Sequence, residues 1–193
     1  MSTAQEIRAT LEPVLAPLGL VVEDVSVSPA GKRRLVRVLV DSDISGIDES
    51  DARSVVAPLS LDAVADATRA VSDELDASDV MGSSPYVLEV SSPGVGRPLT
   101  SRDQLRRQVG RLLEVGHRDG THTGRLVEVG TDSLTLEVPA TKKTPAHPVQ
   151  LDLDGVQRGV VQVEVKRSAA ATEPGLDDPD EPDDTSALEG DHH

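Results

Sequence analysis

YVLEVSSPGVGRPL, residues 86–99, is the stretch of sequence that decides the fold. Its aromatic and β-branched start predicts a strand over 86–91. The prolines that follow fix φ and remove backbone donors, and the glycines permit positive φ, so a shaped turn is expected in place of a flexible linker. The domain boundary is therefore expected near Leu99. The junction motif comprises Ser91, Ser92, Pro93, Gly94, Gly96 and Pro98.

Upstream of this junction, apolar residues recur first at helical and then at alternating spacing. Pro13 lies inside the first helical pattern and predicts a kink or an early stop. The polar connection that follows the second strand has room for one short helix. The expected elements are a helix over 3–18, strands over 20–28 and 35–40, a helix over 61–77 capped by Ser60, and the strand over 86–91. They predict an N-terminal αββαβ domain over 1–99, a small sheet with two helices.

Downstream of the junction the spacing shortens. Thr100 is expected to cap a short helix, and closely spaced β runs follow it. Short strands after a single helix are typical of a small closed barrel. The runs lie at 110–116, 122–129, 132–138, 147–153 and 159–166. The fold class is therefore α+β, with a β-barrel domain over 100–167.

Charge is distributed unevenly along the 193 residues, whose net charge is −15. Residues 1–99 have sixteen acidic and eight basic side chains, whereas residues 100–167 have nine acidic and eleven basic side chains. Residues 168–193 have nine acidic side chains, no Lys or Arg and few apolar ones, so we expect a disordered acidic tail. An acidic chain with local basic clusters can still bind a polyanion.

Catalytic and cofactor motifs are missing from the sequence. Without cysteine there is no disulfide, thiol catalysis or zinc finger, and no nucleophile elbow or phosphate-binding glycine loop occurs. His117, His122 and His147 are interpreted as exposed turn residues. No enzyme, metal site, cofactor or small-molecule substrate is expected. No apolar run approaches the ~20 residues of a membrane span. We expect a soluble, cytoplasmic monomer.

Binding is the remaining class of function, and basic residues form two clusters. An RNA partner would have to be bound through phosphate charge and shape, because a single tyrosine cannot make a base-stacking platform. Alternatively, these side chains only solvate the surface, and Arg97 pairs with Glu89 or Asp103. The junction is slightly favoured because its backbone is better fixed. The candidates are Lys32, Arg33, Arg34 and Arg37 at the hairpin, and Arg97, Arg102, Arg106 and Arg107 at the junction.

Residues 86–99 closely resemble the central signature of the bacterial ribosome maturation factor RimP family. The helix LDAVADATRAVSDELD resembles that family's second helix, and VEDV at 22–25 resembles its first strand. The similarity covers roughly residues 3–166. The connection over 44–60 looks longer than in the family, and the tail after Lys166 looks like an extension.

This resemblance implies an N-terminal α/β domain and a C-terminal Sm-like barrel. It also implies an assembly factor that binds the immature 30S subunit, acting at the central pseudoknot region of 16S rRNA and in incorporation of the twelfth small-subunit protein, a basic ribosomal protein. Two alternatives remain open: a stand-alone Sm-like regulator that binds small RNAs, and an acidic adaptor for a basic protein.

Overall fold

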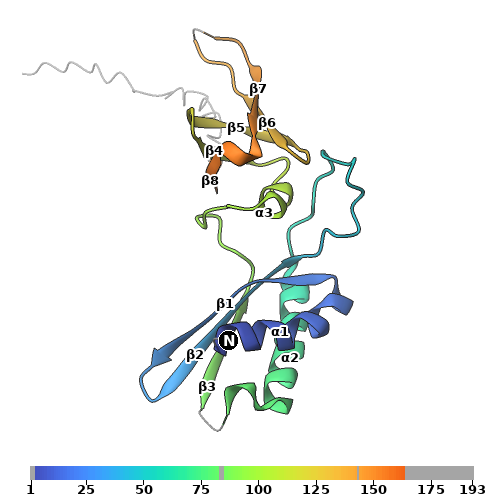
Figure 1. The fold of residues 1–193 in the computed structure, drawn as a ribbon, viewed down its shortest axis with the longest axis vertical. Coiled ribbons are helices and arrows are strands. Elements are labelled where there is room, and N and C mark those ends of the chain that lie inside the picture. The colour runs from blue at the N-terminus through green and yellow to red at the C-terminus, as the bar shows by residue number, and fades with distance from the viewer. Residues whose placement is uncertain (1–2, 83–84, 143, 164–193) are drawn as a thin grey trace, which may run out of the picture.

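The computed structural model describes residues 3–82, 85–142 and 144–163 (Figure 1). The predicted acidic tail lies outside the described residues. Two sheets, each with its own apolar core, follow one another along the chain. A mixed α+β fold is thereby confirmed, whereas independent folding units divided at Leu99 stay a prediction.

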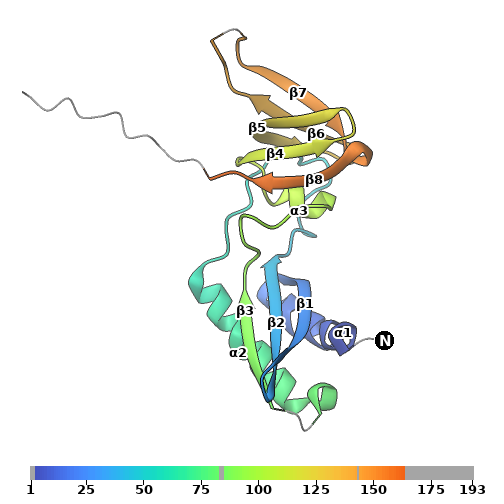
Figure 2. The same cartoon turned by 90° about the vertical axis from the view of Figure 1, so that its left-hand side faces the viewer.

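The first unit has the predicted αββαβ order and contains a three-stranded sheet of order β1-β2-β3. Strands β1 and β2 are antiparallel, and β3 runs parallel to β2. The elements are α1 (Thr3–Leu15), the 3₁₀ turn η1 (Ala16–Leu18), β1 (Leu20–Ala30), β2 (Arg33–Ser42), α2 (Leu61–Ala77), the 3₁₀ turn η2 (Asp79–Met81) and β3 (Tyr86–Ser91). Both helices pack on the same face of the sheet (Figure 2).

Local chemistry explains where these helices begin and end. Helix α1 contains Pro13 and stops at Leu15, and Gly19 then adopts φ 68° to turn the chain into β1. Ser60 caps α2 as predicted, because its hydroxyl accepts a hydrogen bond from the Ala63 amide at 3.0 Å. The connection over 43–60 contains turns and no helix, although the sequence left room for one.

The second unit is a five-stranded antiparallel sheet of order β7-β6-β5-β4-β8, which follows one short helix. Its elements are α3 (Arg102–Arg106), β4 (Leu112–His117), β5 (Gly120–Val129), β6 (Ser133–Val138), β7 (His147–Asp152), the 3₁₀ turn η3 (Leu153–Gly155) and β8 (Val156–Val161). The last strand begins three residues before its predicted start at 159. Leu99 bridges to Gly159 of β8 through two 2.8 Å backbone hydrogen bonds, which attach the linker to this sheet.

The cap of α3 differs from the prediction. Ser101, and not Thr100, accepts the hydrogen bond from the Gln104 amide, and the Gln104 side chain accepts one from the Ser101 amide in return. This reciprocal capping box is encoded as S-x-x-Q, a signal that the sequence contained. The described helices are all too short or too polar to span a lipid bilayer.

Candidate functional site

The tip of the β1–β2 hairpin carries cations whose side chains pair with none of the other described residues. Gly31 adopts φ 62° at the turn, and Lys32 and Arg33 beside it are exposed, whereas Arg34 is half-buried. Among the described residues, no hydrogen bond or ion pair involves the side chain of any of these three cations. No charge of a described residue therefore neutralises these cations, as binding of an external anion requires.

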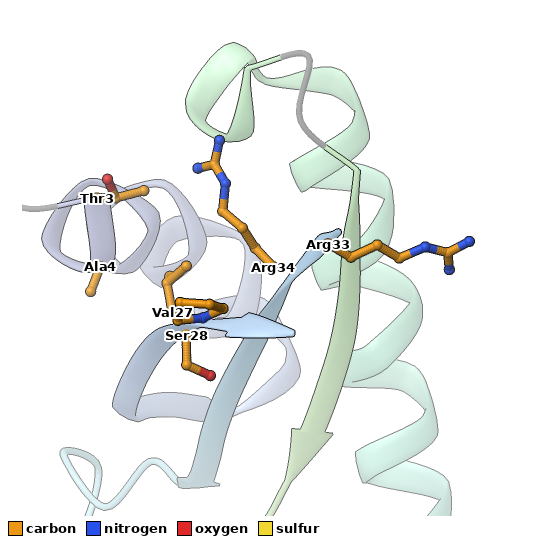
Figure 3. A pocket seen from close by; sticks show the side chains of 7 residues that line it. Thr3, Ala4, Val27, Ser28, Arg33 and Arg34 are labelled. Carbon is orange, nitrogen blue, oxygen red and sulfur yellow. The ribbon is translucent and has the colours of Figure 1, made fainter. Parts of the chain in front are cut away.

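A groove lies beside this tip, between the first turn of α1 and the hairpin (Figure 3). Its volume is about 460 Å³, and none of the described residues that line it carries a carboxylate. The Arg34 side chain extends between α1 and η2, whereas Arg33 points away on the opposite side of β2 (Figure 3). The lining residues are Thr3, Ala4, Val27, Ser28, Pro29, Arg33 and Arg34.

Arg37, the fourth predicted hairpin residue, differs from these three. Its guanidinium donates to Glu89 of β3 at 2.8 Å, and both side chains are about half exposed. Register places the two residues opposite each other on neighbouring strands. Glu89 partly neutralises the charge of Arg37. Arg37 therefore attracts an external phosphate less strongly than Lys32, Arg33 and Arg34 do.

At the other end of the sheet, a β-bulge in β1 directs Glu23 toward the second unit. Pairing with β2 passes from Val22 opposite Val40 to Asp24 opposite Leu39, which leaves Glu23 as the extra residue. Arg8 of α1 donates to the carbonyls of Val22 and Glu23, both at 2.7 Å. Bulges commonly re-aim a side chain in this way.

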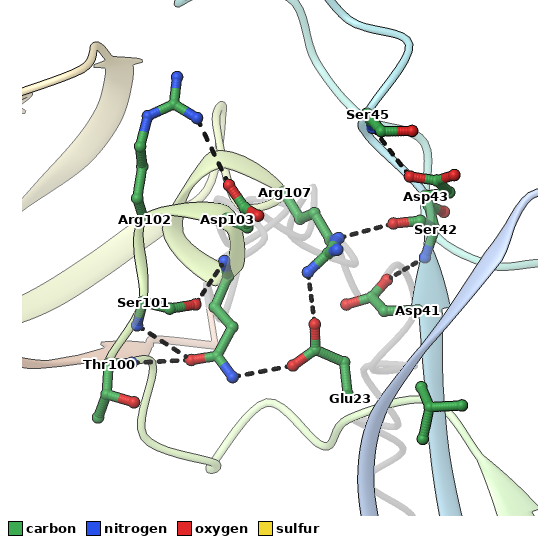
Figure 4. Close-up of polar contacts among 12 residues, drawn as sticks. Glu23, Asp41, Ser42, Asp43, Ser45, Thr100, Ser101, Arg102, Asp103 and Arg107 are labelled. Atoms are coloured by element: carbon green, nitrogen blue, oxygen red, sulfur yellow. Dashed lines mark hydrogen bonds and ion pairs between the residues drawn. The ribbon is translucent and has the colours of Figure 1, made fainter. Parts of the chain in front are cut away.

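Glu23 is the centre of a polar network between the two units (Figure 4). Its Oε1 accepts a 2.5 Å hydrogen bond from Arg107, and its Oε2 accepts one of 2.8 Å from Gln104. Arg107 also donates to the carbonyl of Ser42 at 2.7 Å. Because these partners come from β1, β2 and the region of α3, the network fixes one unit against the other.

Arg106 holds the long connection over 43–60 against the second unit. It is only 2% exposed and donates to the carbonyls of Asp51 and Ser54 and to the Ser54 hydroxyl, at 2.6 to 3.2 Å. The same segment pairs with β5, because the Val129 amide donates to the Ala52 carbonyl at 2.9 Å.

The predicted junction cations are thus engaged by the protein itself. Arg106 and Arg107 are 2% and 7% exposed, so burial argues against the predicted contact of their guanidinium groups with a ribosome. Arg102 donates to the Gly130 carbonyl at 2.8 Å and lies 3.4 Å from Asp103. Arg97 pairs with Asp24 at 3.2 Å, and not with Glu89 or Asp103 as the alternative interpretation had it.

The junction motif forms a turn, as expected, but not for all of the expected reasons. The Arg97 amide donates to the Gly94 carbonyl at 3.0 Å, and β3 ends at Ser91. Gly94 and Gly96 do not adopt positive φ, and a Cβ at either position would meet nothing within 4 Å. The expected use of their conformational freedom is therefore wrong. Ser92 and Pro93 line a small cavity of about 90 Å³, next to Arg107 and Asp41.

Asp41 is a titratable group at this junction whose pKa is shifted. Burial raises the pKa of its carboxyl above the ordinary value of 3.8, although the Ser42 amide, which donates at 2.8 Å, and the charge of Arg107 act in the opposite direction. Asp41 faces the same space as Arg107 and Ser42 (Figure 4).

The histidine interpretation is wrong at His117 and also at His122, which is half-buried within β5. His117 is only 5% exposed; its Nε2 lies 3.1 Å from Asp152, and its Nδ1 accepts from the Asp119 amide at 3.3 Å. Gly155 covers the ring so closely that a Cβ there would lie 2.0 Å from Nε2. The parts of the chain described here contain no cluster of three or more metal-ligating side chains.

Fold and site together define a two-unit α+β protein with an exposed cationic hairpin and an internally paired junction between the units. The sequence model of the RimP N-terminal domain matches residues 10–96. The chain belongs to the RimP family: it is 40% identical over 198 residues to ribosome maturation factor RimP of Kineococcus radiotolerans, which covers 92% of this chain and 91% of that protein.

Two further relatives, also named ribosome maturation factor RimP, are longer than this chain. The protein of Frankia casuarinae is 40% identical over 173 residues, which cover 84% of this chain and 60% of the relative. The protein of a Parafrankia species is 39% identical over 186 residues, which cover 82% of this chain and 56% of the relative. This chain therefore spans less than two thirds of the length of these two relatives.

Proposed function

We propose that this chain acts as a ribosome maturation factor, which binds the immature 30S subunit and promotes its assembly by binding and not by catalysis. The observation that carries this proposal is membership of a family whose relatives are named for ribosome maturation. The proposed partners are 16S rRNA near its central pseudoknot and the twelfth small-subunit protein. We also propose that the protein is a cytoplasmic monomer that uses no cofactor and no small-molecule substrate.

We propose the hairpin residues Lys32, Arg33 and Arg34 as the contact with rRNA. Phosphate contacts supply much of the affinity for a nucleic acid, and they need cations that are not already neutralised. These three side chains meet that requirement, whereas Arg106 and Arg107 are buried in internal contacts. The slight preference for the junction, which came from sequence, is therefore reversed in favour of the hairpin.

A basic ribosomal protein would be bound elsewhere. The hairpin cations would repel it, whereas the rest of the first 99 residues has an excess of acidic side chains. This separation supports two contact surfaces on the first unit, a basic one for RNA and an acidic one for protein.

We further propose that the second unit is an Sm-like domain. A short helix precedes five antiparallel strands, and the last of them, β8, lies beside the first, β4. The junction network of Glu23, Gln104 and Arg107 would then hold this domain in one orientation relative to the hairpin.

Co-sedimentation tests the proposed function. The chain should pellet with 30S precursors and less with mature 30S subunits, and its affinity should fall as salt rises. Light scattering on the free protein should report one chain per particle. Equal binding to both particles, or none, would contradict a maturation role, and a ring of six or seven chains would favour the stand-alone RNA regulator.

A further inference from the structure

We propose that the groove between α1 and the β1–β2 hairpin holds the base of one unpaired nucleotide. This inference rests on the proposed rRNA contact and adds a ligand site to it. The groove volume of about 460 Å³ lies within the range of roughly 300–1,000 Å³ typical of ligand pockets. The groove opens beside the free cations of the hairpin tip (Figure 3).

The lining suits a flat, largely apolar ligand with polar edges. Ala4, Val27 and Pro29 provide apolar surface, and the hydroxyl-bearing residues Thr3 and Ser28 add polar groups. None of the lining residues that the structure describes carries a carboxylate, so none of them repels the phosphate attached to a nucleotide. This combination matches a nucleobase better than it matches a cation.

Arg34 supplies the group that would recognise the base. Its guanidinium extends between α1 and η2, and no described residue pairs with it. RNA-binding proteins stack unpaired bases on guanidinium planes as well as on aromatic rings, and a guanidinium can also donate to base edges. The single tyrosine does not offer an alternative platform, because the Tyr86 hydroxyl donates to Asp76 and its ring packs on the core.

The two neighbouring cations fit the phosphate chain on either side of this base. Figure 3 shows Arg33 on the opposite side of β2 from Arg34. Lys32 is exposed in the turn between β1 and β2. A sugar–phosphate backbone that crosses the tip would contact Lys32 and Arg33 and turn one base toward Arg34. Unpaired nucleotides can be turned out in this way, unlike bases within a duplex.

A pair of matched oligonucleotides separates base binding from phosphate binding. The probes are an eight-nucleotide oligoadenylate and an abasic ribose–phosphate chain of the same length and charge. The protein should bind the first at least about fivefold more tightly, which is the lower end of the range for stacking one base. Equal affinity for the two probes, or binding to neither at concentrations that saturate 30S precursors, would overturn the inference.

Two substitutions then place the base in the groove. Ala4→Leu fills the groove, and Arg34→Lys keeps the charge but removes the planar group; both should abolish most of the preference for oligoadenylate. The matched controls are Ala9→Leu and Arg69→Lys, at exposed positions of α1 and α2 outside the groove lining, and both should retain the preference. A preference unchanged in both test variants would exclude the groove as the base site, and circular dichroism checks that each variant folds.

Failure of this inference is distinguishable from failure of the rRNA contact. The double variant Lys32→Ala, Arg33→Ala should weaken binding of both oligonucleotides equally, because it removes only phosphate contacts. If that variant loses affinity for 30S precursors while Ala4→Leu and Arg34→Lys retain the base preference, the rRNA contact stands and the groove assignment fails. Competition by oligoglutamate as strong as by oligoadenylate would assign the groove to an acidic peptide.

Discussion

The carboxylate of Glu23 accepts a 2.5 Å hydrogen bond from Arg107, across the boundary between the two units, and both side chains are about nine-tenths buried. The bulge in β1 directs the carboxylate of Glu23, and the turn after α3 presents the guanidinium of Arg107. Gln104 caps α3 through its oxygen and contacts Glu23 through its nitrogen, so the same side chain ties helix formation to docking of the units.

Glu23→Ala should destabilise the protein by about 3–5 kcal/mol, because it leaves the buried charge of Arg107 without a partner. Chemical denaturation measures this loss, and small-angle scattering should report a larger radius of gyration as the units separate. The double variant Glu23→Ala, Arg107→Met should recover part of the loss, because no unpaired charge remains. A loss in the double variant equal to the sum of the losses in Glu23→Ala and Arg107→Met would argue against a coupled pair.

Arg106→Met should release the segment 51–54 from the second unit. The substitution leaves the carbonyls of Asp51 and Ser54 without their buried donor. Each carbonyl that water does not reach should lower the free energy of unfolding by about 1–3 kcal/mol. Hydrogen exchange at the Val129 amide should accelerate, because its acceptor is Ala52. Arg53→Met is the control: its ion pair with Glu128 is exposed and should be worth at most about 1 kcal/mol.

Asp41→Asn should raise the melting temperature at pH 7. Burial raises the pKa of Asp41, so the folded state binds its proton more tightly than the unfolded state does, and the ionised carboxylate lowers stability at neutral pH. The gain should shrink as pH falls through the raised pKa toward 3.8, where the wild-type carboxyl also becomes neutral. An equal gain at pH 3 and pH 7 would show that ionisation is not the cause.

Gly94→Ala and Gly96→Ala should each change the free energy of unfolding by no more than ~0.5 kcal/mol. Neither glycine needs positive φ, and a methyl group at either position meets open space. Gly155→Ala is the contrasting variant, because its Cβ would collide with His117 and should cost about 1–3 kcal/mol. Thermal unfolding of the three variants checks this ranking, and a large loss in either linker variant would restore a conformational role for these glycines.

Patterns of spacing predicted most of the elements but not the contacts between the two units. Val36, Val38 and Val40 alternate with polar or less buried residues, so β2 could be recognised without knowing its neighbours. The bulge at Glu23 depends on register with β2, which no single strand encodes. Arg106 and Arg107 resembled surface residues of a short helix, and only the approach of the other unit buries them.

The same limitation explains the errors at single residues. His117 lies at the end of a strand next to a turn, where exposure is the ordinary expectation, but Gly155 and Asp152 from a later segment cover it. Arg97 has acidic neighbours in sequence, yet it pairs with Asp24, 73 residues earlier. The exposure of Lys32 and Arg33 could be predicted, because a tight turn between two long strands lies at the surface.

The most direct test of the hairpin as the rRNA contact is the salt dependence of binding to 30S precursors. The double variant Lys32→Ala, Arg33→Ala is compared with Lys142→Ala, Arg158→Ala, which removes one Lys and one Arg from exposed positions of the second unit. The hairpin variant should bind more weakly, with a log–log salt slope smaller by roughly 1.4–1.8, or about 0.7–0.9 for each lost phosphate contact. The control should match the wild type, and equal slopes in the hairpin variant and the wild type would contradict the account.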